Sequence, residues 1–571
     1  MTLLSDLPVL IVDCQATGAA SAGGHLLEIG WLSTSAKNAR AVVPEQVAAL
    51  RLRLPAGGSI PPSVQRITGI GAEEAEAGFE PGDAWHRMVK DLGAGPIPTV
   101  IHYARFEQPL LSRLHREADP DGPFPFQITC THEVVRRLMP DLPRKGLRAV
   151  AGYFDYGVGA QRRCAGHVAA TAWIWFHLCG LLADHAGVNT WPELLAWLEA
   201  TPVLPSPRRF PMDPMQIGRL PDRPGVYRMA RESGDLLYVG KAASLRRRVA
   251  SYFRPRARHP EHILEMLTQA RVLESSETGS ALEAALVEVE DIHRFLPPYN
   301  RALRSENRRL WFASRDFSSF CPASDDAYPI GPLPDRRIAA ALSATGRICE
   351  IPPSPETICD SLVVYPNRVP DADIFAEGVR LFGSRNGHGA PSVRARNELG
   401  MIARRLWKEK KKAEAAKAAE KTEENEEDSH KPEPEEATWT PAAVAGRLES
   451  TLRHTGRMLR RARWFALLAE SVLVWRPASE DEARRHLAAF EKGRLKSARY
   501  LAAGRKIPIP PGHGRPIRLR RGEIDLTAYD TMRVLTTELR RLLAENREPV
   551  LRLSGKAVLG PAQLSRALFW F

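Results

Sequence analysis

Apolar runs alternate with helical patterns over the first third of the chain. The runs LPVLIVD (7–13) and HLLEIGWL (25–32) are short and apolar, which is typical of buried strands. Strands that alternate with helices indicate an α/β domain ending near residue 182. An amphipathic helical stretch follows at 183–202, and PVLPSPRRFPMDP (202–214) then marks a Pro-rich boundary.

A compact segment follows from about residue 216 to 305. Its runs GVYRM and LLYVG are separated by the polar turn SGD, so they should pair as a hairpin that brings Tyr227 close to Tyr238. The next run, SLRRRVASYF, is helical and basic. A second helix, SALEAALVEVEDIHRFL, places a set of apolar residues on one face, with Glu288 at the edge of that face. The apolar set is Leu282, Leu286, Val289 and Ile292.

The pattern changes again after residue 305. Residues 306–407 mix short strands and helices, and residues 408–436 contain almost no apolar residue larger than Ala. In the last part, RWFALLAESVLVWRP (463–477) favours a β-hairpin and YDTMRVLTTELRRLLAE (529–545) favours an amphipathic helix.

These patterns predict an α/β multidomain protein with an α+β C-terminal region. The expected segments are an α/β domain at 1–182, a helical and Pro-rich linker at 183–215, a small α/β domain at 216–305, an extension at 306–407, a charged flexible linker at 408–439 and an α+β domain at 440–571.

Composition favours an anionic partner. The 571-residue chain has a formal net charge of +13, which points first to nucleic acid and second to an anionic membrane. No stretch approaches the roughly 20 consecutive apolar residues of a spanning helix, so we expect no membrane partner. The N-terminus lacks the basic region of a signal peptide, and the seven cysteines are scattered and odd in number. We therefore expect a protein of the reducing cytoplasm.

The small α/β segment contains the residue types that phosphodiester cleavage needs. A base must activate water, a cation must hold the phosphate, and charge must be neutralised as the 3′ oxygen leaves. Two tyrosines, an arginine and one carboxylate can meet these needs. The alternative is that the tyrosines are strand core, the arginines a solvated helix face and Glu288 a surface acid.

The combined motifs resemble the GIY-YIG nuclease domain of UvrC and its shorter relative Cho. GVY at 225–227 stands for GIY and YVG at 238–240 for YIG, and Arg248 follows ten residues after the second tyrosine. The resemblance covers about 90 residues. It continues through the pair Tyr252 and Phe253, then Glu288, and ends at the Pro-x-Tyr-Asn signature, Pro297, Tyr299 and Asn300.

The resemblance implies a role for each residue. Tyr238 or Tyr227 would position or deprotonate water, Arg248 would hold the scissile phosphate, and Lys241 would add positive potential. Glu288 would be the single protein ligand of Mg²⁺ or Mn²⁺, with water and phosphate oxygens completing the shell. Substrate contacts are expected from Tyr252 and Asn300.

Other parts of UvrC are missing from the sequence. We find neither its second nuclease half nor its helix-hairpin-helix repeats, and no convincing UvrB-binding hairpin. UvrA- and UvrB-type repair proteins therefore enter only as candidate partners. Where UvrC has a Cys-rich stretch for an iron–sulfur cluster, this chain has only Cys321, Cys349 and Cys359, so no cluster is expected.

The first domain resembles the DnaQ-like, or DEDD, 3′–5′ exonucleases over about 170 residues. IVDCQATG at 11–18 matches the family's Asp-x-Glu-x-Thr-Gly, ITGI at 67–70 matches its Thr-Gly-Ile segment, and VIHYARFEQPLL at 100–111 matches its second motif. The third motif matches a segment that ends in HVAATAWIW. The resemblance implies an RNase H-like fold with two metals held by four carboxylates.

That site is degenerate in this sequence. Asp13 is retained, Gln15 replaces an acid, and Glu107 is a longer carboxylate than the usual Asp. One alignment places Arg162 at the family's His and His167 at its last Asp. The other places His167 at the His and leaves Ala172 at the Asp. Either way the fourth carboxylate is lost, and we expect an inactive exonuclease that binds DNA or a partner through its old cleft.

Two classes of function remain open. One is a metal-dependent DNA endonuclease in repair, fused to the inactive exonuclease domain. The other is a DNA-binding scaffold without nuclease activity. A third reading keeps an active 3′–5′ exonuclease with a variant site.

The composition of 408–436 generates a first prediction. A segment that cannot bury a core should be the preferred site of proteolysis. Brief trypsin digestion should therefore release a C-terminal piece that begins near residue 440, as N-terminal sequencing of the fragment would show. Protection of this segment in the free protein would contradict the assignment.

Overall fold

A computed structural model gives the chain as two compact units, which are described separately. Unit 1 comprises Met1–Thr278 with Phe295–Arg301, and unit 2 comprises Gly279–Arg294 with Ala302–Phe571. The structure describes residues 2–90, 92, 95–157, 163–254, 257–304, 308–314, 319–335, 372–385, 440–477, 484–510, 524–554 and 557–568. Arg162, Cys349, Cys359 and the segment 408–436 lie outside the described residues.

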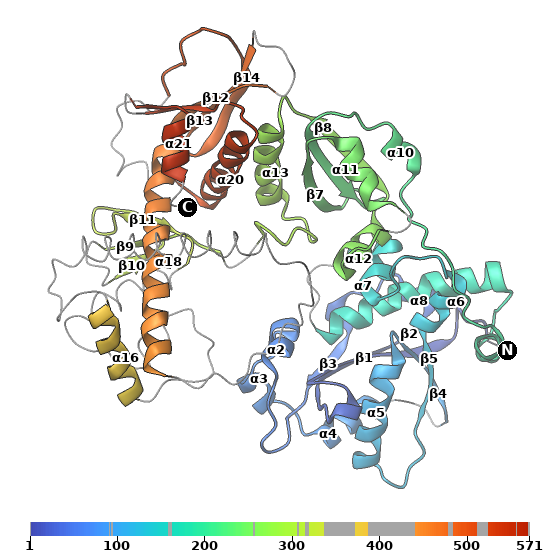
Figure 1. Ribbon diagram of the computed structural model, residues 1–571. Coiled ribbons are helices and arrows are strands. Elements are labelled where there is room, and N and C mark those ends of the chain that lie inside the picture. Colours follow the sequence, from blue (N-terminus) through green and yellow to red (C-terminus); the bar gives the residue numbers. More distant parts are fainter. Residues whose placement is uncertain are drawn as a thin grey trace, which may run out of the picture. The chain divides into compact units, whose positions relative to one another are not determined.

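A five-stranded sheet forms the centre of the N-terminal domain in unit 1 (Figure 1). Its order is β3-β2-β1-β4-β5, in which β1 runs antiparallel to β2 and parallel to β4. The strands are β1 (Pro8–Ala16), β2 (Leu26–Ser35), β3 (Ala48–Arg51), β4 (Ile97–Ile101) and β5 (Phe126–Cys130). The structure confirms the first two strands predicted from the apolar runs.

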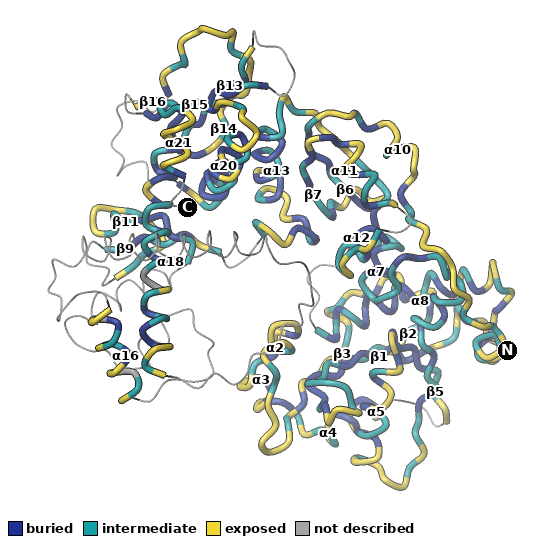
Figure 2. Tube along the Cα trace, viewed as in Figure 1, coloured by how far each residue is buried: buried dark blue, intermediate teal, exposed yellow. Residues whose placement is uncertain are grey.

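Alternate residues of β1 face two different helical layers. Val9 and Ile11 join a core cluster with α8 (Cys164–Ala186), whereas Leu10 and Val12 join a cluster with α4 (Pro81–Val89) and α5 (Ala104–Ala118). Since successive side chains of a strand point to opposite faces, one strand can anchor both layers. Figure 2 shows the resulting buried stretch of β1.

The remaining helices surround this sheet. Those in the described N-terminal domain are η1 (Ala20–Ala22), α1 (Ala36–Ala39), η2 (Pro44–Gln46), α2 (Pro62–Thr68), α3 (Ala72–Glu76), α6 (Thr131–Leu138), α7 (Leu147–Tyr153) and α9 (Trp191–Ala200). Trp191 and Leu194 of α9 pack into the same cluster as α8.

Helix α8 is the one helix among the described residues that is long and apolar enough to cross a membrane. However, 61% of its most apolar window is buried inside the domain. It also packs closely on β2, because at Gly30 a β carbon would lie only 2.6 Å from the Cys164 β carbon. These contacts make α8 a core helix of the sheet domain.

A three-stranded antiparallel sheet of order β7-β6-β8 follows in unit 1. It consists of β6 (Gly225–Ala230), β7 (Leu236–Ala242) and β8 (Val272–Glu277), with helices α10 (Pro214–Gly218), α11 (Leu245–Tyr252) and α12 (Glu261–Gln269). The pairing of β6 with β7 confirms the predicted hairpin, and α11 confirms the predicted basic helix.

Unit 2 contains two antiparallel sheets with helices. The larger has the order β14-β13-β12-β15-β16 and the smaller β10-β9-β11. The strands are β9 (Trp311–Ala313), β10 (Phe320–Cys321), β11 (Ile330–Leu333), β12 (Ser471–Trp475), β13 (Arg484–Glu491), β14 (Arg494–Ala502), β15 (Val550–Leu553) and β16 (Val558–Leu559). The helices are α13 (Ala281–Phe295, in unit 2 as far as Arg294), α16 (Ala372–Arg385), α18 (Pro441–Leu468), α20 (Leu526–Ala544) and α21 (Pro561–Leu568).

The hairpin predicted at 463–477 is wrong. The first half of that run is the end of α18, and only the second half forms a strand, β12. Trp464, Phe465 and Leu468 have helical spacing and all enter the main apolar cluster of unit 2. A short apolar run does not by its periodicity distinguish two strands from a buried helix end and one strand.

A buried ion pair holds the core of unit 2. Asp530 on α20 is fully buried, and Arg308 donates to its two carboxylate oxygens at 2.7 and 2.8 Å. His293 of α13 lies 2.9 Å from the same group. Burial opposes ionisation of Asp530, but the hydrogen bonds from His293 and Arg308 outweigh it and lower its pKa.

Asp530→Ala should therefore destabilise unit 2 strongly. Removing one partner of a buried pair typically costs ~3–5 kcal/mol, because the other charge stays buried and unpaired. Urea titration followed by hydrogen exchange of α20 peptides would measure the loss. As the pKa of Asp530 is lowered, the contribution is present above its ordinary value of 3.8 and declines as pH falls below it.

Glu545→Ala is the matched control just beyond α20. Glu545 pairs with Arg541, but both side chains are more than one-third exposed, so the effect should stay within about 0.5 kcal/mol. Equal effects of the two substitutions would show that the Asp530 pair does not hold the core.

Candidate functional site

The hairpin of β6 and β7 places two tyrosines on one face. Tyr227 pairs with Gly240 and Tyr238 pairs with Met229 across the ladder, so the two tyrosines are diagonal neighbours. Their ring centroids lie 6.1 Å apart. Gly240 has to be small, because a β carbon there would collide with the Tyr227 hydroxyl. The glycine of YVG thus makes room for the tyrosine of GVY.

Helix α11 adds Arg248 and Tyr252 to this pair. The Tyr227 and Tyr252 hydroxyls are hydrogen-bonded at 3.0 Å, and Arg248 donates to the Tyr252 hydroxyl at 3.1 Å. The Arg248 guanidinium carbon also lies 5.0 Å from the centroid of the Tyr252 ring, which is a cation–π distance. These three residues, with Tyr238, form what we call the tyrosine cluster.

The degree of burial of Tyr227 and Tyr238 determines which of the two tyrosines water can reach. Tyr227 is fully buried, and burial followed by the neighbouring Tyr238 and Tyr252 raises its pKa well above 10. Tyr238 and Lys241, both on β7, are half-buried. Burial opposes the charge of Arg248, but Tyr227 and Tyr252 raise its pKa, so the guanidinium stays cationic.

Asn300 supports the strand that carries Tyr238. Its side-chain oxygen accepts from the Val239 amide at 2.9 Å, and its side-chain nitrogen donates to the Val239 carbonyl at 2.8 Å. Both ends of the amide are thus used on β7, and a contact between Asn300 and substrate stays a prediction. The preceding Tyr299 donates to Glu265 at 2.7 Å and accepts from Gln269 at 2.6 Å.

Glu288 lies on α13, as expected. The predicted apolar face of this helix is buried, and Glu288 beside it is half-buried. This part of α13 belongs to unit 2, whereas the tyrosine cluster belongs to unit 1. The structure therefore brings the tyrosines and Arg248 together. That Glu288 acts in the same site as these residues stays a prediction.

The second candidate site lies in the N-terminal sheet domain. Nδ1 of His167 on α8 lies 3.2 Å from both carboxylate oxygens of Asp13 and 3.2 Å from the Gln15 amide nitrogen. Ala172 is instead buried in the α8 core cluster. His167 thus lies beside Asp13, as either alignment requires, whereas Ala172, which one alignment places at the last Asp, does not.

Glu107 on α5 completes this group. It is 4% exposed, and burial, followed by the charge of Asp13, raises its pKa. Among the described residues, no group of three or more His, Cys, Asp and Glu is arranged to hold a metal ion.

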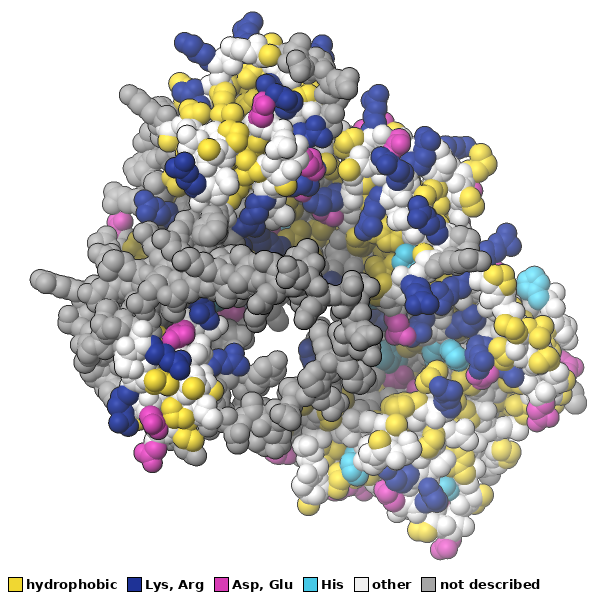
Figure 3. Space-filling model, in the orientation of Figure 1, with side chains coloured by type: hydrophobic (Ala, Val, Ile, Leu, Met, Phe, Trp, Pro, Cys, Tyr) yellow, Lys and Arg dark blue, Asp and Glu magenta, His cyan; other side chains and the backbone are white. Residues whose placement is uncertain are grey.

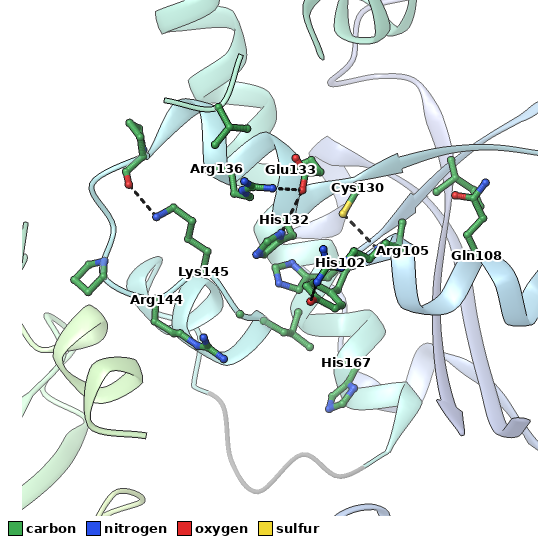
Figure 4. Close-up of a pocket in the computed structure, with 18 of the residues that line it drawn as sticks. His102, Arg105, Gln108, Cys130, His132, Glu133, Arg136, Arg144, Lys145 and His167 are labelled. Atoms are coloured by element: carbon green, nitrogen blue, oxygen red, sulfur yellow. Dashed lines mark hydrogen bonds and ion pairs between the residues drawn. The ribbon is translucent and has the colours of Figure 1, made fainter. Parts of the chain in front are cut away.

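A cavity of about 1040 Å³ opens beside Asp13 and His167 (Figure 4). More cationic than acidic residues line this cavity. The cationic residues are Arg105, Arg136, Arg144 and Lys145, and the acidic residues are Asp13 and Glu133. Sequence reasoning missed this basic lining. Its signal is present in YARFE, VVRRL and PRKG, three short segments that each end or begin a helix of this domain.

Two histidines sit among these cations. Burial and the nearby His132 lower the pKa of His102 to about 3, and burial lowers that of His132. Both rings are therefore neutral near pH 7. His102 bonds Thr131 through Nδ1 at 2.9 Å, while its buried Nε2 has no partner among the described residues.

Comparison with known proteins identifies the segment that carries the tyrosine cluster. A sequence model of the UvrC-like GIY-YIG domain matches residues 223–301. A protein of Mycobacterium tuberculosis, provisionally named a bifunctional exonuclease/endonuclease, is 30% identical over 354 residues, which are 60% of this chain and 52% of that protein. The chain thus matches only about half the length of this relative.

Other similar proteins match the GIY-YIG part alone. UvrABC system protein C of Sphingopyxis alaskensis is 49% identical over 90 residues, which are 16% of this chain and 14% of that protein. The crystal structure of the magnesium-bound GIY-YIG domain of UvrC from Thermotoga maritima is 31% identical, covering 15% of this chain and 93% of that one, with a TM-score of 0.14.

The matched residues coincide with the sheet that carries the tyrosine cluster, and the longer match reaches beyond it into other parts of the chain. Residues 223–301 therefore form a domain that matches the UvrC-like GIY-YIG family, and the similarity to the bifunctional exonuclease/endonuclease extends beyond this domain.

Proposed function

We propose that the protein is a metal-dependent DNA endonuclease that nicks damaged or distorted duplex in repair. The observation that supports this most is the tyrosine cluster, in which an arginine and hydrogen-bonded tyrosines meet on the hairpin face. UvrA- and UvrB-type repair proteins are the partners to test first. The N-terminal domain, in this proposal, has lost exonuclease activity.

Tyr238 is our candidate for the group that positions or deprotonates the attacking water. It is half-buried, whereas Tyr227 is enclosed and hydrogen-bonded to Tyr252. The raised pKa of Tyr227 keeps its proton in place, so Tyr227 orients its neighbours through hydrogen bonds.

Arg248 is the candidate for holding the scissile phosphate. Its guanidinium has further N–H groups beyond the one that Tyr252 accepts, and a planar fork of donors matches phosphate oxygens. Lys241, on the same strand as Tyr238, would raise the positive potential at the hairpin.

Glu288 is the candidate metal ligand. A single half-buried carboxylate fits Mg²⁺ or Mn²⁺, because such ions keep several waters and share their remaining positions with substrate phosphate. When bound, the cation would neutralise charge on the leaving oxygen.

The N-terminal cleft retains the features needed to bind DNA. Four cations line it against only two acids, and two of its three histidines, His102 and His132, are neutral. Such a lining suits a phosphate backbone better than a pair of metal ions. We therefore assign the cleft a binding role.

The first test concerns Arg248 and Glu288. Arg248→Ala or Glu288→Ala should lower the Mg²⁺-dependent nicking rate of supercoiled plasmid roughly 100- to 1000-fold, since each removes a group aimed at transition-state charge. Unchanged melting curves would show that the fold is intact.

Exposed neighbours provide matched controls. Arg247 on α11 is 80% exposed at its side chain, and Glu290 on α13 is exposed. Arg247→Ala and Glu290→Ala should nick at close to the unmodified rate. If Arg248→Ala and Glu288→Ala also nick normally, the cleavage residues lie elsewhere.

The second test concerns the exonuclease fold. Two metals held close together need several negative ligands, and this site offers Asp13 and Glu107 while Gln15 and His167 replace acids. End-labelled single-stranded DNA should therefore keep its length in Mg²⁺ and in Mn²⁺ when incubated with Glu288→Ala protein.

Glu288→Ala serves as the background because endonuclease cleavage would otherwise obscure the result. Stepwise shortening from the 3′ end that Asp13→Ala abolishes would refute the assignment. It would establish Gln15 and His167 as neutral ligands of a variant exonuclease site.

A further inference from the structure

The edge strand β14 of unit 2 is unusually open. From Lys496 to Tyr500 every residue is exposed, although the strand pairs with β13 along its whole length. β14 is the end strand in the order β14-β13-β12-β15-β16, so its outer edge faces no further described strand. A long edge like this can accept a partner.

The segment around this strand is strongly basic. Residues 484–506 contain eight Lys and Arg but only one acid, Glu491. The cations are Arg484, Arg485, Lys492, Arg494, Lys496, Arg499, Arg505 and Lys506. Lys and Arg side chains project from this part of unit 2 in Figure 3.

Some of these charges are already paired. Lys496 lies 2.6 Å from Glu491, and Arg494 lies 2.6 Å from Asp525. Within the described part of the chain, no carboxylate pairs with Arg499, Arg505 or Lys506, and all three are exposed. The strand and the turn after it therefore carry uncompensated positive charge.

A ladder of rings crosses the sheet to this edge. Trp475 of β12 stacks on His486 of β13 at 5.0 Å and 17°, and His486 contacts Tyr500 of β14 at 4.7 Å and 35°. Trp475 and His486 are buried, whereas Tyr500 is 51% exposed. Burial lowers the pKa of His486, so the ring beneath Tyr500 is neutral.

Small residues flank the exposed ring. Ala498 and Ala502 lie two positions before and after Tyr500, so they share its face of the strand and leave the ring uncovered along the strand axis. Cations alone on an edge strand serve to prevent edge-to-edge pairing. The prevention of edge-to-edge pairing does not explain why the Tyr500 ring packs against the buried His486 ring and still remains exposed.

We propose that β14 and the turn after it bind single-stranded DNA, with one base stacked on Tyr500 and phosphates held by Arg505 and Lys506. Aromatic platforms beside a basic track are the common means of holding unpaired strands without sequence preference. This site shares no residue with the tyrosine cluster or the N-terminal cleft, and it goes beyond the proposed incision activity. It would hold a strand that is already unpaired.

The test follows local protection, because the full chain has other candidate DNA sites. Full-length protein is titrated with a thymidine oligonucleotide in EDTA, so that cleavage plays no part, and hydrogen exchange of peptides from 494–506 is measured. The oligonucleotide should protect these peptides. In Tyr500→Ala the midpoint should shift upward roughly 5- to 150-fold, equivalent to ~1–3 kcal/mol for one stacked base.

Tyr500→Phe is the matched variant, since it keeps the ring and should retain the original midpoint. Arg505→Ala should reduce the salt dependence of the midpoint by about 0.7 in log–log slope. Absence of protection, equal midpoints for Tyr500→Ala and the unmodified protein, or protection by duplex alone would each overturn the proposal. Since no nicking is measured, failure of the endonuclease assignment would leave this result unaffected.

Discussion

The buried side-chain amide of Gln269 joins the tyrosine hairpin to the N-terminal domain. Its oxygen accepts hydrogen bonds from Arg231 at 2.9 and 3.1 Å, and its nitrogen donates to the Tyr299 hydroxyl at 2.6 Å. The same side chain fills the space over Gly152 of α7, where a β carbon would collide with it. Because Gln269 is 1% exposed, any bond lost here would leave a buried polar group unsatisfied.

Helix α12, which ends at Gln269, reaches both candidate sites of unit 1. On the side of the hairpin, Gln269 donates a hydrogen bond to Tyr299. The next residue, Asn300, holds the backbone of Val239, which is the neighbour of Tyr238. Toward the N-terminal cleft, Thr268 accepts a hydrogen bond from the backbone of Arg144, which lines the cavity. One helix therefore contacts both the segment that holds the strand of Tyr238 and the wall of the N-terminal cavity. The N-terminal domain and the domain of the tyrosine hairpin are therefore linked through this helix.

The sequence predicted the parts of the site that lie close together along the chain. A polar turn between two apolar runs was enough to place Tyr227 beside Tyr238, and the resemblance to the GIY-YIG domain identified Arg248. The sequence did not predict contacts between segments that are distant along the chain. Examples are the hydrogen bonds of Asn300 to the Val239 backbone and the basic wall of the N-terminal cavity. The misassigned hairpin at 463–477 has the same origin, because only packing in the core of unit 2 distinguishes the end of α18 from a strand.

The alternation of β1 separates the apolar scaffold of the N-terminal domain from the polar residues of its candidate site. Val12 and Cys14 point into the α4 and α5 layer, so the residues between and after them, Asp13 and Gln15, point toward α8 and meet His167. Gln15 and His167 are half-buried and stand outside the apolar clusters. Substitutions at these two positions therefore cost little in packing, whereas a change at Val12 would disturb the sheet. The apolar positions preserve the scaffold, and the polar positions between them are left to determine whether it binds metal ions or phosphates.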